Sequence, residues 1–68
     1  MANRQHDLTK WRARNRQSQS ALAGRVGVSQ SYLAMIENWQ REPSLGVALK
    51  LSAVTKIPVK KFKLPEAA

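Results

Sequence analysis

Residues that commonly start or stop helices recur at short intervals along this chain, and this spacing limits it to short helices. Ser18 and Ser29 are good N-cap residues, and Gly27 can take the positive φ at which many helices end. Pro43 and Ser44 can open a further helix. Apolar residues between these positions recur with helical spacing, and no segment alternates with the period of two typical of a strand. We therefore expect an all-α domain of five short helices, over residues 8–15, 19–26, 30–38, 45–55 and 58–62.

The first and fourth of these helices have unusual faces. Asp7 is the expected N-cap of the first, whose inward face carries polar Arg12 and Asn15 beside Leu8 and Trp11, so that it packs weakly unless Arg12 finds a partner. The helix over residues 45–55 is apolar on most sides and should contact more than one neighbour. Its two stripes are Leu45, Ala48 and Leu49 on one side and Val47, Leu51 and Val54 on the other.

Composition narrows the kinds of partner. Twelve Lys and Arg against four Asp and Glu give a net charge of +8, which favours a polyanion: nucleic acid, an acidic protein or an anionic membrane. With 43% apolar residues the chain should still fold around a core. It has no cysteine and a single histidine, so we expect no disulfide, no metal site and no other cofactor. No nucleophile–base pair or carboxylate dyad is evident, and we expect no enzymatic activity.

We expect one folded domain over residues 7–63, with a flexible arm over 1–6 and a loose tail over 64–68. The polar start has no apolar segment typical of a secretion signal, and no stretch approaches the roughly 20 apolar residues that span a bilayer. A cytoplasmic location without a membrane partner is therefore expected. From a length of 68 residues we expect no separate domain that senses a small molecule.

Residues 19–38 fit the pattern of a helix-turn-helix. A small residue, Ala23, lies where two helices would touch, and Gly27 lies at the turn between them. Five apolar residues occupy the positions that such a corner buries. They are Leu22, Val26, Val28, Leu33 and Ile36.

This pattern resembles the helix-turn-helix family of phage Cro proteins and of the DNA-binding domains of phage repressors, the lambda-repressor-like fold. The resemblance spans residues 8–62 and rests on Arg12, QSALA at 19–23, VGVSQ at 26–30, IEN at 36–38 and PSL at 43–45. It departs from the family at Gln17, at Trp39 where Gly is common, and at Thr55 and Lys56. The resemblance implies a transcription regulator, such as a repressor, in the cytoplasm of a bacterium or phage-infected host, associated with the nucleoid.

The helix over residues 30–38 is the expected recognition helix in the major groove of double-stranded DNA. A Gln amide can pair in bidentate fashion with adenine, so Gln30 is the first candidate for base contact. Ser31 can contact several bases, and Met35 can contact a thymine methyl group or instead fill the core.

Backbone phosphates are the expected targets of a second set of residues. Gln19 opens a helix whose N–H groups favour an anion, and the resemblance implies that its side chain braces Gln30. Ser29 is foremost a cap with a possible phosphate contact, and Asn38 and Arg41 flank the recognition helix. Further cations could reach DNA as an arm or along the backbone, or simply form a solvated face. They are Arg4, Arg14 and Arg16.

The resemblance also implies a structural salt bridge between Arg12 and Glu37, joining the first and third helices. Trp11 is expected in the core. Trp39 could stack on the sugar-phosphate backbone, pack at a dimer contact or shield the end of the third helix.

Specific binding by so small a module usually needs two half-sites about one helical turn apart. We therefore expect a weak homodimer, completed on a pseudo-palindromic operator. The candidate contact surface is the second stripe of the fourth helix with the apolar residues that follow it. Its members are Val47, Leu51, Val54, Ile57, Val59 and Phe62.

Other function classes share these features. An antitoxin or a restriction-modification controller would carry a similar module and bind a protein through the surface of its fourth helix. A basic membrane-active or RNA-binding protein is a further alternative, although the chain offers no aromatic platform for single-stranded RNA.

Overall fold

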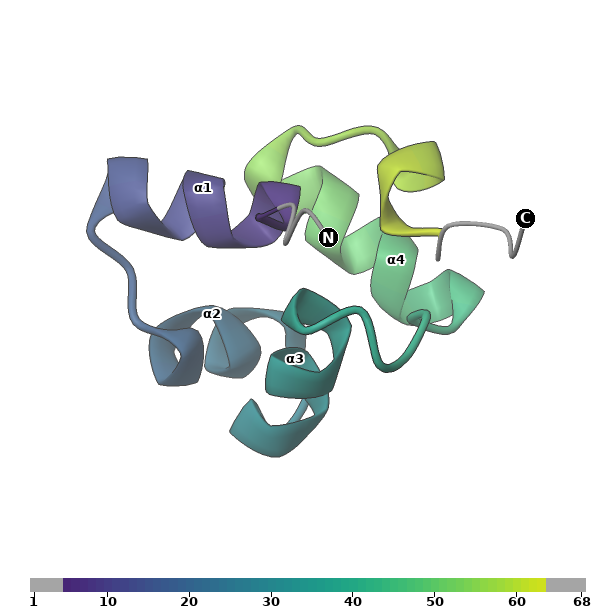
Figure 1. Ribbon diagram of the computed structural model, residues 1–68, viewed down its shortest axis with the longest axis horizontal. Helices are drawn as coiled ribbons and strands as arrows, with labels where there is room; N and C mark the ends of the chain where they lie inside the picture. The colour runs from purple at the N-terminus through teal and green to yellow at the C-terminus, as the bar shows by residue number, and fades with distance from the viewer. Residues whose placement is uncertain (1–4, 64–68) are drawn as a thin grey trace.

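A computed structural model describes residues 5–63 of the chain. Within them lie four α-helices and one short 3₁₀ turn (Figure 1). They are α1 (Asp7–Asn15), α2 (Gln19–Val26), α3 (Gln30–Glu37), α4 (Leu45–Thr55) and η1 (Val59–Phe62). The expected all-α class is confirmed for this part of the chain. Arg4, most of the expected arm and the expected tail over 64–68 lie outside the described residues.

The fifth expected helix is the one element whose type was predicted wrongly. Pro58 makes no side-chain cap, and the chain is already extended again at Lys63, so only one 3₁₀ turn forms. Residues three apart eclipse one another in a 3₁₀ helix, and here Val59 and Phe62 both turn toward the protein. The turn thus packs the Phe62 side chain against α4.

Three of the four α-helices begin with the predicted serine caps. Each serine hydroxyl accepts a hydrogen bond from the backbone N–H three residues further along the chain. The distances are 3.0 Å at Ser18, 3.1 Å at Ser29 and 3.4 Å at Ser44. For α1 the cap is His6 and not Asp7: its Nδ1 accepts the Leu8 N–H at 3.0 Å, and Asp7 becomes the first helical residue. His6 is 1% exposed and belongs to the folded domain, although the sequence placed it in the arm.

Three α-helices end at a cap residue with positive φ, and α3 is followed by one directly after its cap, Asn38. Glycine supplies only one of these four residues, Gly27 at +76°. The others are Arg16, Trp39 and Lys56, at +54°, +63° and +66°. At Trp39 the next N–H, from Gln40, donates to Met35 O at 2.9 Å. This is the hydrogen bond that closes a Schellman motif. The chain therefore keeps a glycine-type exit from α3 despite the tryptophan.

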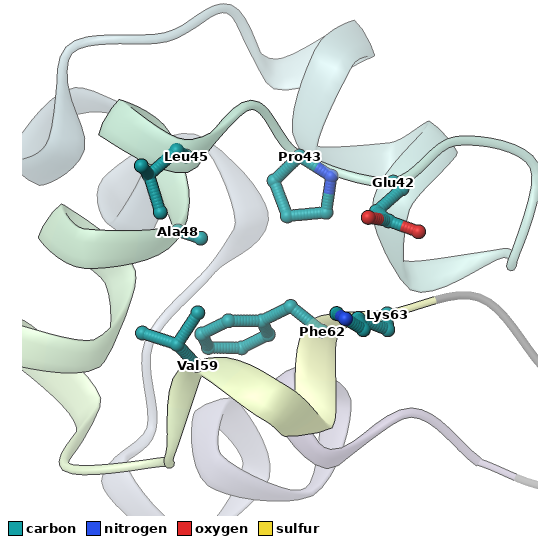
Figure 2. Close-up of a pocket in the computed structure, with 7 residues that line it drawn as sticks. All are labelled: Glu42, Pro43, Leu45, Ala48, Val59, Phe62 and Lys63. Carbon is teal, nitrogen blue, oxygen red and sulfur yellow. The ribbon is translucent and has the colours of Figure 1, made fainter.

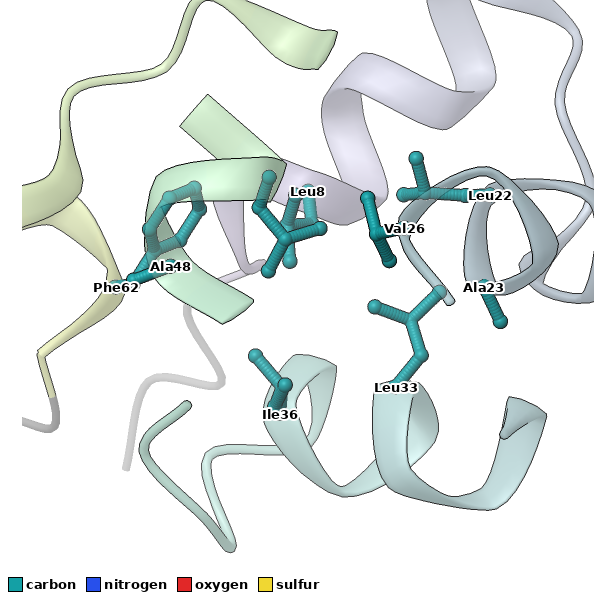
Figure 3. Close-up of a cluster of buried hydrophobic side chains, with 9 residues drawn as sticks. Leu8, Leu22, Ala23, Val26, Leu33, Ile36, Ala48 and Phe62 are labelled. Atoms are coloured by element: carbon teal, nitrogen blue, oxygen red, sulfur yellow. The ribbon is translucent and has the colours of Figure 1, made fainter. Parts of the chain in front are cut away.

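Side chains from every element meet in one core (Figure 3). Leu8 of α1 lies there with Leu22 and Val26 of α2 and Leu33 and Ile36 of α3, and Ala23 is buried beside them. Contributions from α4 and η1 complete it, namely Ala48, Leu51 and Phe62.

Two of the expected dimer contacts are therefore core residues. Leu51 and Phe62 are 0% and 2% exposed, because η1 folds back on α4 and covers this stripe within the same chain. The other stripe instead leaves Leu45 and Leu49 in solvent, 70% and 54% exposed. Trp11, expected in the core, packs against its edge and is half-buried.

The arrangement leaves α3 at the margin of the molecule. In Figure 1 the helix lies at the bottom beside α2, and α1, α4 and η1 lie above it. The lysine-bearing turn η1 is thus on the opposite side of the fold from α3.

Candidate nucleic-acid interface

The pair α2 and α3 forms the corner that holds the candidate interface. Three residues, 27–29, join the helices, and the αL conformation of Gly27 reverses the chain between them. Ala23 is 2% exposed at the contact between the helices. Its small side chain is what permits their close crossing, as the sequence predicted.

A buried carboxylate fixes this corner to α1. Arg12 donates to Glu37 through Nε at 2.8 Å and Nη2 at 2.7 Å, so the predicted ion pair is bidentate. The Thr9 hydroxyl donates to Oε1 at 2.8 Å, a contact that the sequence analysis missed. The Gln19 amide donates to the same oxygen at 3.3 Å.

Gln19 also has a partner other than the Gln30 that the resemblance implies. The hydrogen bond made by its side chain joins the start of α2 to Glu37 at the end of α3, whereas Gln30 lies at the start of α3. With this hydrogen bond from Gln19, the Glu37 carboxylate links α1, α2 and α3.

The ionisation of this cluster follows from its contacts. Burial disfavours the charged form of Glu37, but hydrogen bonds from Arg12, Thr9 and Gln19 outweigh it and lower the pKa of the carboxyl. The hydrogen bond to Glu37 raises the pKa of Arg12, against a smaller effect of burial. Both groups are ionised at neutral pH, and neither is free to contact a ligand.

The outward face of α3 carries neutral side chains. Gln30 and Ser31 are exposed in its first turn, and Ala34 and Met35 are half-buried one turn further on. Asn38 follows as the exposed C-cap. The inward positions are Leu33, Ile36 and Glu37, all buried. The three predicted base contacts thus lie on one accessible surface of the corner.

Arg41 is held beside this face by an aromatic ring. Its guanidinium carbon lies 5.1 Å from the centre of the Tyr32 ring, within range of a cation–π interaction. The Tyr32 hydroxyl in turn accepts the N–H of Ser44, which fixes the ring against the loop into α4. This support for Arg41 was not foreseen, because an aromatic residue at this position gives no distinctive pattern.

The remaining predicted contacts lie around the corner. The Ser29 hydroxyl is used as a cap, and Arg14 and Arg16 are exposed at the end of α1. The Trp39 ring lies 4.5 Å from that of His6, between centroids, and His6 is stacked 6.2 Å from Phe62. Of the three roles considered for Trp39, these contacts support shielding the end of α3.

A second surface lies between α4 and η1. Figure 2 shows a pocket of about 130 Å³ lined by Glu42, Pro43, Leu45, Ala48, Val59, Phe62 and Lys63. Exposed Leu45 stands at this pocket, and Leu49 is exposed one turn further along α4. The other expected dimer contacts are half-buried against the core. They are Val47, Val54, Ile57 and Val59.

Comparison with known protein families also identifies a helix-turn-helix in this chain. The sequence model described as helix-turn-helix matches residues 10–62. No curated protein and no solved structure gives a match. Across residues 5–63, no cluster of three His, Cys, Asp or Glu side chains could hold a metal ion. No helix in the same residues is long and apolar enough to cross a membrane.

Proposed function

Because the chain belongs to the helix-turn-helix family of DNA-binding regulators, we propose that it represses transcription by inserting α3 into the major groove of an operator. The observation that carries this proposal is the neutral, accessible face of α3 on a rigid corner. An α-helix with its side chains is about 10 to 12 Å across, so α3 can lie along a major groove that is about 12 Å wide. Arg41, which lies against Tyr32 of α3, supplies a cation for a phosphate beside this face.

Each predicted contact then has a role. Gln30 pairs with adenine, Ser31 contacts a base edge, and Met35 meets a thymine methyl group. Phosphates are bound by Arg41 on its Tyr32 support, by Asn38, and by the N–H groups that Gln19 and Ser29 present at the starts of α2 and α3. Arg14 and Arg16 meet the backbone further out, and Arg4 would add one more contact with DNA.

We further propose that two copies bind one pseudo-palindromic operator in the manner of Cro or a short repressor. The exposed side chains Leu45 and Leu49, with half-buried Val59, replace the core residues Leu51 and Phe62 in the expected contact. Two large apolar side chains form a small interface, which fits a dimer that is weak in solution and completed on DNA. Repression then depends on protein concentration and operator sequence.

The pocket between α4 and η1 favours one alternative function, that of an antitoxin or a restriction-modification controller that binds a protein partner. Leu45 and the pocket beside it offer an apolar surface, and Glu42 and Lys63, which also line the pocket, could pair with polar groups of a partner. An apolar helix of a toxin is the kind of partner that this surface fits.

Selection of binding sites from random duplex DNA, at two salt concentrations, tests the main proposal. We expect a palindromic motif and an affinity that falls steeply with salt. Gln30→Ala should relax preference at one position of each half-site, and Lys60→Ala, on the opposite side of the fold, should leave the motif unchanged. Affinity without any motif would refute sequence-specific regulation.

A further inference from the structure

The groove-facing helix carries no accessible charge. Across Gln30–Glu37 the only ionisable acid or base apart from the Tyr32 phenol is Glu37, whose side chain is 3% exposed and fully engaged with α1 and α2. The arginine that contacts α3 from outside the Glu37 cluster is Arg41, which belongs to the loop before α4. The side chains proposed to contact bases are therefore neutral and lie on α3, whereas the positive charges lie on other segments of the chain.

This separation limits which bases α3 can distinguish. Guanine is contacted in the major groove mainly by Arg or Lys donating to its O6 and N7, and the cytosine amino group is met by Asp or Glu. The accessible face of α3 has neither kind of side chain, and the exposed Ser31 hydroxyl, which can contact any base edge, does not distinguish one base from another. It has one amide, at Gln30, which matches adenine, and two adjacent apolar side chains, Ala34 and Met35, which match a thymine methyl group.

The positions of these residues set their spacing on DNA. Ala34 follows Gln30 by four residues, as Met35 follows Ser31, so each apolar residue lies about 6 Å further along the helix axis. Successive bases of one strand are about 3.4 Å apart. The amide and the apolar pair therefore lie about two base steps from each other.

From this geometry we infer that α3 recognises A·T pairs only, on the premise that the proposed function is correct. Gln30 pairs with an adenine, and about two base pairs away Ala34 and Met35 hold the 5-methyl group of a thymine between them. Guanine is not recognised through α3. The half-site is therefore defined by one amide and one apolar pocket, and Ala34 is a specificity residue alongside Met35.

Single-atom changes in the DNA test this inference with the unaltered protein. In the selected duplex, each thymine is replaced in turn by uracil, which lacks only the methyl group, and each adenine by 7-deazaadenine, which lacks the N7 acceptor. We expect uracil to weaken binding about fourfold at one thymine per half-site, the factor for burying one methyl group. At one adenine about two base pairs away, 7-deazaadenine should weaken binding about fivefold or more.

Protein variants assign each effect to its side chain. In Met35→Ala the uracil penalty should fall, because only Ala34 still contacts the methyl group, and the 7-deazaadenine penalty should remain. In Gln30→Ala the 7-deazaadenine penalty should disappear and the uracil penalty should remain. Met35→Leu keeps apolar bulk and should retain the uracil penalty, provided that its thermal melt matches that of the unaltered protein.

Three outcomes bear on the inference. The expected pattern supports it. Tight, sequence-specific binding that is indifferent to uracil overturns it and leaves the proposed function standing. So does a loss of affinity with 7-deazaguanine that Gln30→Ala or Met35→Ala abolishes, because that loss would show guanine recognised through α3. Binding without sequence preference overturns both.

Discussion

Replacing Glu37 should destabilise the whole domain, because one carboxylate joins three helices. Its side chain is 3% exposed and accepts hydrogen bonds from Thr9, Arg12 and Gln19. In Glu37→Ala the Arg12 guanidinium loses its partner. Breaking a buried ion pair costs about 3 to 5 kcal/mol. Arg12 is 18% exposed and can recover some hydration, so we expect the lower end, about 3 kcal/mol.

The assay is thermal unfolding followed by circular dichroism. For a domain of this size, each kcal/mol lost from the free energy of unfolding lowers the melting temperature by about 4 to 8 °C. Glu37→Ala should therefore melt about 12 to 24 °C below the unaltered protein. Lys60→Ala, an exposed charge on η1, is the matched control and should change stability by less than about 0.5 kcal/mol. A melting temperature for Glu37→Ala within 3 °C of the control would show that the cluster contributes no more than a surface contact.

The same cluster predicts how stability depends on pH. The folded pKa of Glu37 is below its ordinary value of 4.5, so its stabilising effect is fully present above that pH and is lost as the pH falls through the folded value. Glu37→Gln removes this titration and should flatten the loss of melting temperature below pH 4.5. Parallel profiles for the two proteins would contradict the lowered pKa.

Further substitutions test four separate features. Arg41→Ala should weaken binding to all duplexes alike and reduce the salt slope by about one, measured by fluorescence anisotropy; a change confined to one base position would contradict a phosphate contact. Lys56→Gly should raise stability by about 1 kcal/mol in thermal melts, because Lys56 is exposed at φ +66°; a lower melting temperature would show that the αL turn is unstrained. His6→Ala should cost at least the roughly 1 kcal/mol of a lost N-cap, and His6→Asn, which retains a capping acceptor, should cost less; equal losses would locate the effect in the aromatic packing instead. Leu49→Glu should lower dimer formation in sedimentation without changing the monomer melt, whereas Leu51→Glu should unfold the domain; a dimer that survives Leu49→Glu would place the interface elsewhere.

The elements that the sequence predicts well are those set by local chemistry. Ser18, Ser29 and Ser44 cap helices because their hydroxyls satisfy N–H groups three residues away, and Gly27 ends α2 because it takes positive φ at little cost. The bounds of α2 and α4 agree with the sequence for this reason.

Features that depend on the return of distant segments could not be predicted in this way. Because α4 is apolar on most sides, its covered face is decided by where η1 packs, which local periodicity does not specify. The sequence therefore assigned Leu51 and Phe62 to the dimer surface and overlooked exposed Leu49. Similarly, His6 caps α1 within an aromatic cluster formed by residues more than thirty positions away.

In the candidate interface, too, the features set by local geometry could be predicted and those set by long-range packing could not. The outward position of Gln30, Ser31 and Met35 follows from helical geometry alone. The hydrogen bond from Gln19 to Glu37 and the Tyr32 ring beneath Arg41 depend on how helices and loops pack, and only the structure reveals them.

The central claim is that duplex DNA meets the protein at the neutral face of α3. Titration of the labelled protein with its selected duplex, followed by the backbone amide signals in NMR, tests this most directly. We expect the largest shifts over residues 30–35, at Gln19 and near Arg41, with little change at residues 56–63 on the opposite side of the fold. Shifts concentrated at the lysines of η1, with α3 unaffected, would contradict the account.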